Sequence, residues 1–559
     1  MMPRTARTAA LLVLGTLAAS LDLAGCFPFA LHDDCEHKPL YCSENGGGTG
    51  GAGGMAAGGT TSAGTGGAAG TGGATGTGGA GGEPTPVGCV PSDGQSWTAD
   101  ESCGVFVSTT GSDDGAGTPD APVKTLAQAI QLAVTKEDES ARRVYACAER
   151  FEEVVTVTAG VTIHGGLDCK ANWGWDGEKK TILTTSPGVV PLTMRAVGDT
   201  VRLEDVHILA PKIDSSDAGK SAIAAIADRC KVALVRCTVE AGDAAPGDSG
   251  APPPAQREPG NDGARGNDAC SAETVFTAMP LPNDCGTPDI SDDSLGGRAG
   301  IGYADRGGVG TSGSPGAEIN PNAGSYDATN NTCSNGQRGR NGDLGEAGAG
   351  GRGIGQLSSL GYAGIRGRDG KNGQTAQGGG GGGSSRGNTS CPGLNNGGAS
   401  GGNGGAGGCG GAGGKGGSPG GSSIALLSLN AKLTFREVLL IAGKGGKGGD
   451  GSEGQTGGPG GSGGTGGLRG RYMNGDPIAG MLDGCAGGPG GVGGTGGRGG
   501  GGQGGHSLGI AFQGTPDTLP SLDGATVQRG APGVGGEGSS DEYDGDAGQA
   551  SDLLDFSAL

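Results

Sequence analysis

Two histidines are the residues of this chain best suited to proton transfer. His164 and His207 lie 43 residues apart, and each alternates with Val and Ile in a short β-rich run. We therefore expect both side chains to point outward, where they could share a surface ladder with Glu204 or Arg202. The simpler interpretation is two solvated strand histidines, so the sequence assigns no catalytic residue.

Other apparent motifs come from the glycine content. The pattern G-x-S-x-G occurs at 416–420 and 460–464, but neither copy lies between a strand and a helix, as a nucleophile elbow requires. Residues 445–450 approach a calcium-binding repeat once and do not recur. We expect no metal and no cofactor, and an enzymatic activity is uncertain and not favoured.

The N-terminus reads as an export signal. Arg4 and Arg7 precede an apolar run over 8–21, which is too short to span a membrane. The run ends Leu-Ala-Gly-Cys at Cys26, which resembles the bacterial lipoprotein box. This resemblance implies a signal peptide over 1–25 and lipid on Cys26, which would anchor the chain to the outer membrane or cell surface. The alternative is an ordinary signal peptide with a chance cysteine.

The remaining cysteines favour an exported, disulfide-stapled protein. There are 15 cysteines, so assigning Cys26 to lipid leaves an even number. The chain has no CxxC pair, which gives zinc or thioredoxin-type chemistry little support. Close neighbours in sequence are candidates for bonding, although the sequence does not fix the connectivity: Cys35/Cys42, Cys89/Cys103, Cys147/Cys169, Cys230/Cys237 and Cys270/Cys285.

Composition limits the partners and the size of the core. Of 559 residues, 134 are glycine, and the net charge is −20. An acidic chain is a poor partner for nucleic acid, and the strict Gly-X-Y repeat of collagen is missing. With 3 % aromatic residues, the chain lacks the apolar stock for one enzyme core filling its whole length. We expect part folded protein and part glycine-rich polymer.

The elements that would position candidate residues lie in 89–242. This segment follows a Cys-bearing segment over 26–45 and a flexible Gly/Ala/Thr tether over 46–88. It holds short β-rich runs, all three tryptophans and one amphipathic helix over 125–133. Phe106 to Gly115, Thr118 to Ile130, Val144 to Cys147 and Gly160 to Gly166 resemble the opening of bacterial surface proteins with a pectin-lyase-like fold. The resemblance implies an all-β, right-handed parallel β-helix, a solenoid of stacked coils.

A repeat extends this pattern into the glycine-rich half. Residues 221–242 align without gaps on 422–443, with six of 22 positions identical. A weaker third copy covers 507–533. We infer successive β-helix coils separated by long glycine-rich excursions over 243–421 and 444–506, followed by an acidic tail over 534–559. The GGX period at 402–417 is compatible with packed polyglycine II helices, which have three residues per turn, and equally with disorder.

Two functions follow as hypotheses. The first is an exported, lipid-anchored surface protein that acts as a structural, adhesive or binding module, with extracellular polysaccharide or envelope components as partners. The alternative is a β-helix carbohydrate-active enzyme, a polysaccharide lyase or hydrolase. Trp173 and Trp175 could stack sugars in the second case, but a role in covering an edge of the β-helix explains them more simply.

Overall fold

The computed structural model describes residues 87–90, 97–175, 177–286 and 292–557. The chain divides into two compact units, Met1–Gly81 and Gly82–Leu559, and only the second is described. The expected signal peptide, Cys26, Cys35, Cys42 and nearly all of the expected tether lie outside the described residues.

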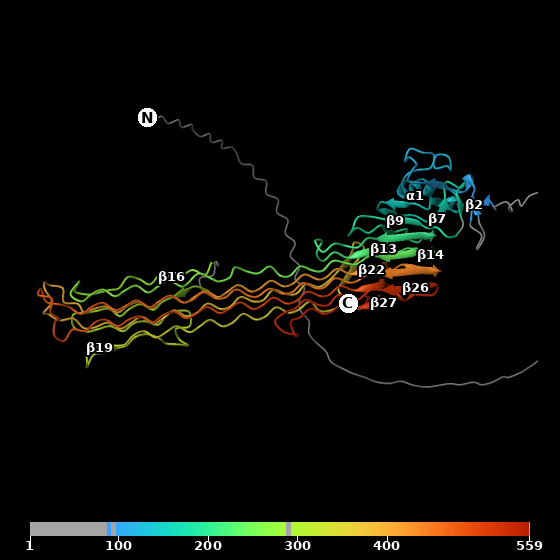
Figure 1. Ribbon diagram of the computed structural model, residues 1–559. Helices are drawn as coiled ribbons and strands as arrows, with labels where there is room; N and C mark the ends of the chain where they lie inside the picture. Colours follow the sequence, from blue (N-terminus) through green and yellow to red (C-terminus); the bar gives the residue numbers. More distant parts are fainter. Residues whose placement is uncertain (1–86, 91–96, 176, 287–291, 558–559) are drawn as a thin grey trace, which may run out of the picture. The chain divides into compact units, whose positions relative to one another are not determined.

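Three sheets form the strand-rich part of the unit (Figure 1). Sheet A contains β1 (Val87–Gly88), β2 (Trp97–Ala99), β3 (Val105–Val107), β4 (Arg143–Cys147), β7 (Val161–Asp168), β8 (Gly174–Trp175), β11 (Thr200–Glu204), β14 (Lys231–Val235) and β23 (Lys432–Arg436). Sheet B contains β5 (Arg150–Glu152), β9 (Thr181–Thr184), β12 (Val206–Ala210), β15 (Thr238–Ala241), β24 (Val438–Ala442) and β26 (Ala525–Arg529). Sheet C contains β6 (Val155–Val157), β10 (Leu192–Met194), β13 (Ala222–Asp228), β22 (Ser423–Leu429), β25 (Ser507–Gln513) and β27 (Ala550–Asp555).

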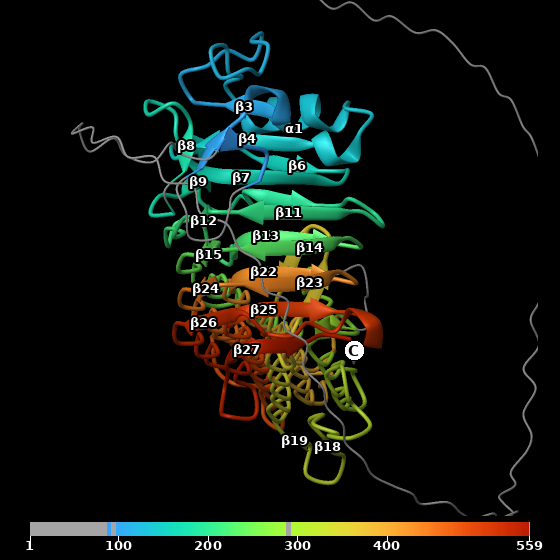
Figure 2. The ribbon, with the colours of Figure 1, turned by 90° about the vertical axis from the view of Figure 1, so that its right-hand side faces the viewer.

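The chain visits these sheets in a fixed cyclic order, as expected of an all-β fold with parallel pairing. From β9 to β15 it runs through sheets B, C and A in turn, and the pairs within sheets B and C are parallel. Figure 2 shows the strands as successive rungs, from β3 to β27. Short β-rich runs and a repeat of about 20 residues were therefore sufficient to predict parallel sheets.

Corners between sheets A and B reuse one backbone device. Asp205, Arg236 and Glu437 each separate an A strand from a B strand, with φ of 55°, 50° and 55°. This left-handed conformation is uncommon for residues other than glycine. A single residue of this kind turns the chain sharply enough for β11 to be followed directly by β12.

The apolar core lies between the three sheets. Alternate residues such as Val201, Leu203, Val232 and Leu234 point inward and are buried. Helix α1 (Leu126–Val134), the α-helix expected near the start of the domain, packs on β3 and β4 with Leu126 and Ile130 buried. No helix in the described part of the chain is long and apolar enough to cross a membrane.

The predicted repeat is the observed strand register. β13, β14 and β15 pair with β22, β23 and β24 at a constant offset of 201 residues, which is the offset of the ungapped alignment. Ser507 pairs with Ser423 in the third copy. The expected acidic tail is a correction, because its residues Ala550–Asp555 form β27 and pair with β25.

The glycine-rich excursions form hydrogen-bonded threads, seen in Figure 1 as long strands of chain running side by side away from the sheets. We call them the glycine bundle and number its main segments thread 1 (243–269), thread 2 (334–353), thread 3 (365–387), thread 4 (397–421), thread 5 (444–468) and thread 6 (484–506). Every third amide of thread 4 from Gly402 to Gly420 donates to thread 6, between Cys485 and Gln503, at 2.8–3.0 Å. Of the two alternatives, the ordered one describes these segments.

Hydrogen bonds also define how the threads are layered. Thread 1 bonds to threads 4 and 5, these bond to thread 6, and thread 6 bonds to thread 2. Thread 3 bonds to threads 2, 4 and 6. Outer thread 2 carries one glycine in three from Gly336 to Gly351, inner thread 4 carries two, and residues 378–383 are six buried glycines. The number of neighbours thus sets the number of glycines per turn.

Close packing explains why those positions are glycine. A Cβ on Gly404 would overlap the carbonyl oxygen of Gly379, and one on Gly411 would overlap the carbonyl oxygen of Gln455. Small two-stranded hairpins extend from the bundle: β16 (Pro282–Asn283) with β17 (Ser294–Leu295), β18 (Tyr326–Asp327) with β19 (Thr332–Cys333), and β20 (Gln356–Ser358) with β21 (Gly361–Ala363).

Candidate functional site

The outer face of sheet A carries the candidate chemistry. Strand register places Tyr145 beside His164, and His164 beside Glu204. Nδ1 of His164 lies 3.3 Å from Oε2 of Glu204. The expected pairing of His164 with Glu204 on one ladder is therefore confirmed.

Its expected exposure is wrong, because His164 is only 3 % exposed. The imidazole stacks on Tyr145 with ring centroids 5.3 Å apart. β1, β2 and β8 extend sheet A past β7, and the aromatic cluster of Trp97, Phe106, Tyr145, Trp173 and Trp175 is buried there. Sequence periodicity identified the outward direction of His164 but not the segment that covers it.

His207 belongs to a different environment. It lies on β12 in sheet B, past the corner at Asp205, and its Nε2 is 2.9 Å from Oε2 of Glu240. The expectation of one ladder containing both histidines is therefore wrong. Each histidine instead pairs with its own glutamate on a neighbouring strand.

A buried charge network lies next to His164, and the sequence gave no indication of it. Nε of Arg236 donates to Oδ1 of Asp205 at 2.9 Å, and Nη2 of Arg236 donates to Oδ2 at 2.8 Å. Nε1 of Trp175 donates to the same Oδ2 at 3.0 Å, while the Arg236 guanidinium lies 5.1 Å from the Trp175 ring centroid. The signal available in sequence was the 31-residue spacing of Asp205 and Arg236, which places both at corners of successive coils.

Glu204 is held as a carboxylate. Burial would raise its pKa, but hydrogen bonds and charge from His164 and Arg202 outweigh burial and lower the pKa to about 2. A group that stays ionised at neutral pH and is 3 % exposed cannot deliver a proton to a substrate in solution. Glu204 therefore fastens the outer face of sheet A rather than acting as a catalytic acid.

Trp173 and Trp175 cover sheet A, in agreement with the simpler interpretation. Each is 5 % exposed, and Phe106 meets Trp173 edge to face at 4.9 Å. Their buried rings offer no platform on which a sugar could stack.

Cysteine pairing follows spatial neighbours. The close pairs Cys89–Cys103 and Cys147–Cys169 are bonded. Cys230 and Cys237 are buried free thiols instead of a pair, and burial raises the pKa of each to about 11. Cys270 and Cys285 do not bond to each other, because the threads bring other cysteines against them: Cys270–Cys391, Cys285–Cys409 and, elsewhere in the bundle, Cys333–Cys485.

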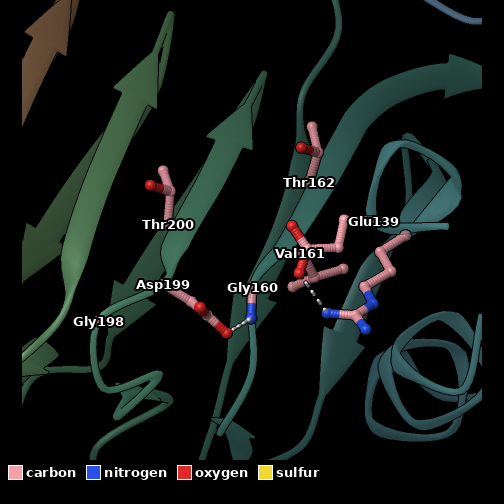
Figure 3. Close-up of a pocket in the computed structure, with 8 residues that line it drawn as sticks. Glu139, Gly160, Val161, Thr162, Gly198, Asp199 and Thr200 are labelled. Carbon is pink, nitrogen blue, oxygen red and sulfur yellow. Dashed lines mark hydrogen bonds and ion pairs between the residues drawn. The ribbon is translucent and has the colours of Figure 1, made fainter. Parts of the chain in front are cut away.

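A cavity of about 300 Å³ opens beside the first residues of β7 and β11 (Figure 3). Oδ2 of Asp199 accepts the N–H of Gly160 at 3.1 Å, and Arg142 pairs with Glu139 at 3.7 Å. Thr162 and Thr200 complete its polar wall. The cavity can accept a small polar group but contains no nucleophile paired with a base.

Within the described ranges, no group of three or more His, Cys, Asp or Glu side chains is arranged to hold a metal ion. The chain matches no protein-family model, no curated protein and no solved structure.

Proposed function

We propose that the chain is an exported, lipid-anchored surface protein in which a parallel β-helix carries a projecting bundle of polyglycine II helices. It acts as a structural, adhesive or binding module of the cell envelope. The supporting observation is the shared register of bundle and sheets: thread 4 donates to thread 6 at an offset of 83 residues, and β22 continues onto β25 at an offset of 84. A projection hydrogen-bonded along its length holds what it carries away from its base.

Disulfides support the proposed location. Three bonds with sequence separations of 121, 124 and 152 residues cross-link the bundle. Such bonds form and persist in oxidising compartments. Together with the lipoprotein-like sequence ending at Cys26, they favour the cell surface.

Carbohydrate-active catalysis is the second candidate, favoured by parallel sheets and by the His164–Glu204 pair. The burial of this pair favours the structural role. A panel of neutral and acidic polysaccharides, with detection of reducing ends and unsaturated products, separates the two. We expect no turnover, whereas turnover lost in His164→Ala or His207→Ala would establish the enzyme.

The surface role needs its own experiment. Cells expressing the full chain are labelled with an alkyne-modified fatty acid and then treated with protease while intact. We expect label on the wild type, none on Cys26→Ser, and cleavage of the wild type from outside. Absence of label and protection from protease would contradict the proposal.

A further inference from the structure

Opposite sides of the glycine bundle carry opposite charge. We define the acidic edge as residues 243–286, which contain thread 1 and the segment after it. The basic edge is residues 334–352 and 365–373, which contain thread 2 and the exposed part of thread 3. Threads 4, 5 and 6 separate thread 1 from thread 2, so the two edges face away from each other.

The imbalance of each edge is clear from its residues. The acidic edge has seven carboxylates and two arginines, a net charge of −5. The basic edge has six Lys and Arg and three carboxylates, a net charge of +3 within a chain whose total is −20. A cationic edge on so acidic a protein is the place where another acidic surface would be attracted.

Part of this charge has no partner within the described residues. Arg340–Asp343, Lys371–Glu346 and Arg366–Asp369 are ion pairs inside the basic edge. Two arginines and three carboxylates, all exposed, make no ion pair with any described residue: Arg338 and Arg368 on the basic edge, and Asp248, Glu258 and Glu273 on the acidic edge.

Each edge also exposes apolar side chains among its charges. Phe276, Met279 and Leu281 are 57 %, 61 % and 65 % exposed on the acidic edge, and Leu344 is 75 % exposed on the basic edge. Charge that selects the partner combined with apolar groups that gain from burial is the composition of a protein interface.

We propose that a second copy of this chain docks its acidic edge against the basic edge of the first. Because the edges lie on opposite sides of one bundle, the contact is heterologous, and further copies can add to form a row of bundles. The proposal goes beyond the proposed function: rows of copies would build a continuous layer, while the single bundle already accounts for projection.

The test is sedimentation velocity of the full chain carrying Cys26→Ser, so that lipid cannot drive association. At 0.1 M salt, where charges act over roughly 10 Å, we expect concentration-dependent oligomers that weaken at 1 M salt. Asp248→Lys/Glu258→Lys/Glu273→Lys leaves two basic edges, and Arg338→Glu/Arg368→Glu leaves two acidic ones. Each should associate about tenfold more weakly or not at all, and an equimolar mixture should restore association.

A matched control reverses three exposed carboxylates elsewhere, Glu537, Asp541 and Glu542, to lysine and should associate like the wild type. Circular dichroism checks that every variant is folded. A wild type that stays monomeric at all salt concentrations, or edge variants that associate like the control, would overturn the proposal. Either result leaves the projecting bundle of the proposed function intact, because far-UV spectra and surface display are measured separately.

Discussion

The N–H of Gly420 donates to the carbonyl oxygen of Gln503 at 2.8 Å, three residues before Ser423 pairs with Ser507 in sheet C. This bond joins threads 4 and 6 where they enter β22 and β25. Bundle and sheets therefore form one hydrogen-bonded body at this junction. Residues that break the bundle are expected to affect the neighbouring strands as well.

Replacing an inward-facing glycine should destabilise the bundle. A Cβ on Gly348 would overlap the carbonyl oxygen of Arg368, whereas Ala349 is exposed in the same thread. We expect Gly348→Ser to lower the free energy of unfolding by about 1–3 kcal/mol through overpacking, and Ala349→Ser to leave it nearly unchanged. Chemical denaturation followed by circular dichroism measures both, and equal effects would contradict the packing account.

Loss of one disulfide should loosen the bundle. Cys285–Cys409 closes a loop with a sequence separation of 124 residues. Replacing both cysteines by alanine should cost roughly 4 kcal/mol in the chain-entropy description. Thermal unfolding of the double variant, with and without reductant, tests this cost. Wild type and variant with the same midpoint under oxidising conditions would show that the bond adds nothing.

The charge network beneath the aromatic cluster should be sensitive to loss of one partner. Arg236→Met leaves Asp205 buried without its guanidinium, and breaking a buried pair costs about 3–5 kcal/mol. Arg265→Met, which removes an exposed pair with Asp268, is the control and should cost less than about 1 kcal/mol. Denaturation midpoints that are equal for the two variants would contradict the buried role of Arg236.

Stability should fall in acid through Glu204. Its pKa is lowered from 4.5 to about 2 in the folded state, so its contribution is complete above pH 4.5 and is lost as pH falls toward 2. Glu204→Gln should therefore show a flatter dependence of unfolding free energy on pH between 4.5 and 2. A variant with the wild-type slope over this window would show that Glu204 is not the group responsible.

Cys230 and Cys237 should be unreactive in the folded protein. Both are buried, and burial raises the pKa of each thiol to about 11, so little thiolate forms near neutral pH. A thiol-specific chromogenic reagent should modify them only after denaturation. Rapid modification of Cys237 in the native state would contradict its position in the core.

Local patterns predicted local pairing well. The ungapped alignment of 221–242 with 422–443 gave the register of three strand pairs, because identical strand lengths leave one way to stack inward-facing residues. Cys147 and Cys169 pair because one coil separates them. Helix α1 was predicted from the spacing of Leu126, Ile130 and Ala133.

Contacts between distant segments were not predictable in the same way. Alternation showed that His164 points outward, but the covering strands β1, β2 and β8 come from elsewhere in the chain. Cys270 and Cys285 were grouped by proximity in sequence, whereas threads folding back on one another decide their partners. The GGX period fixed the turn length but left open whether other threads lie near enough to bond.

Amide hydrogen exchange of residues 402–421 tests the central claim, that the glycine-rich threads are hydrogen-bonded in continuity with the strands. The account predicts slow exchange at Gly402, Gly405, Gly408 and each third residue through Gly420, comparable with the amides of β22. Exchange of these amides at the rate of an unstructured peptide, while β22 stays protected, would contradict it.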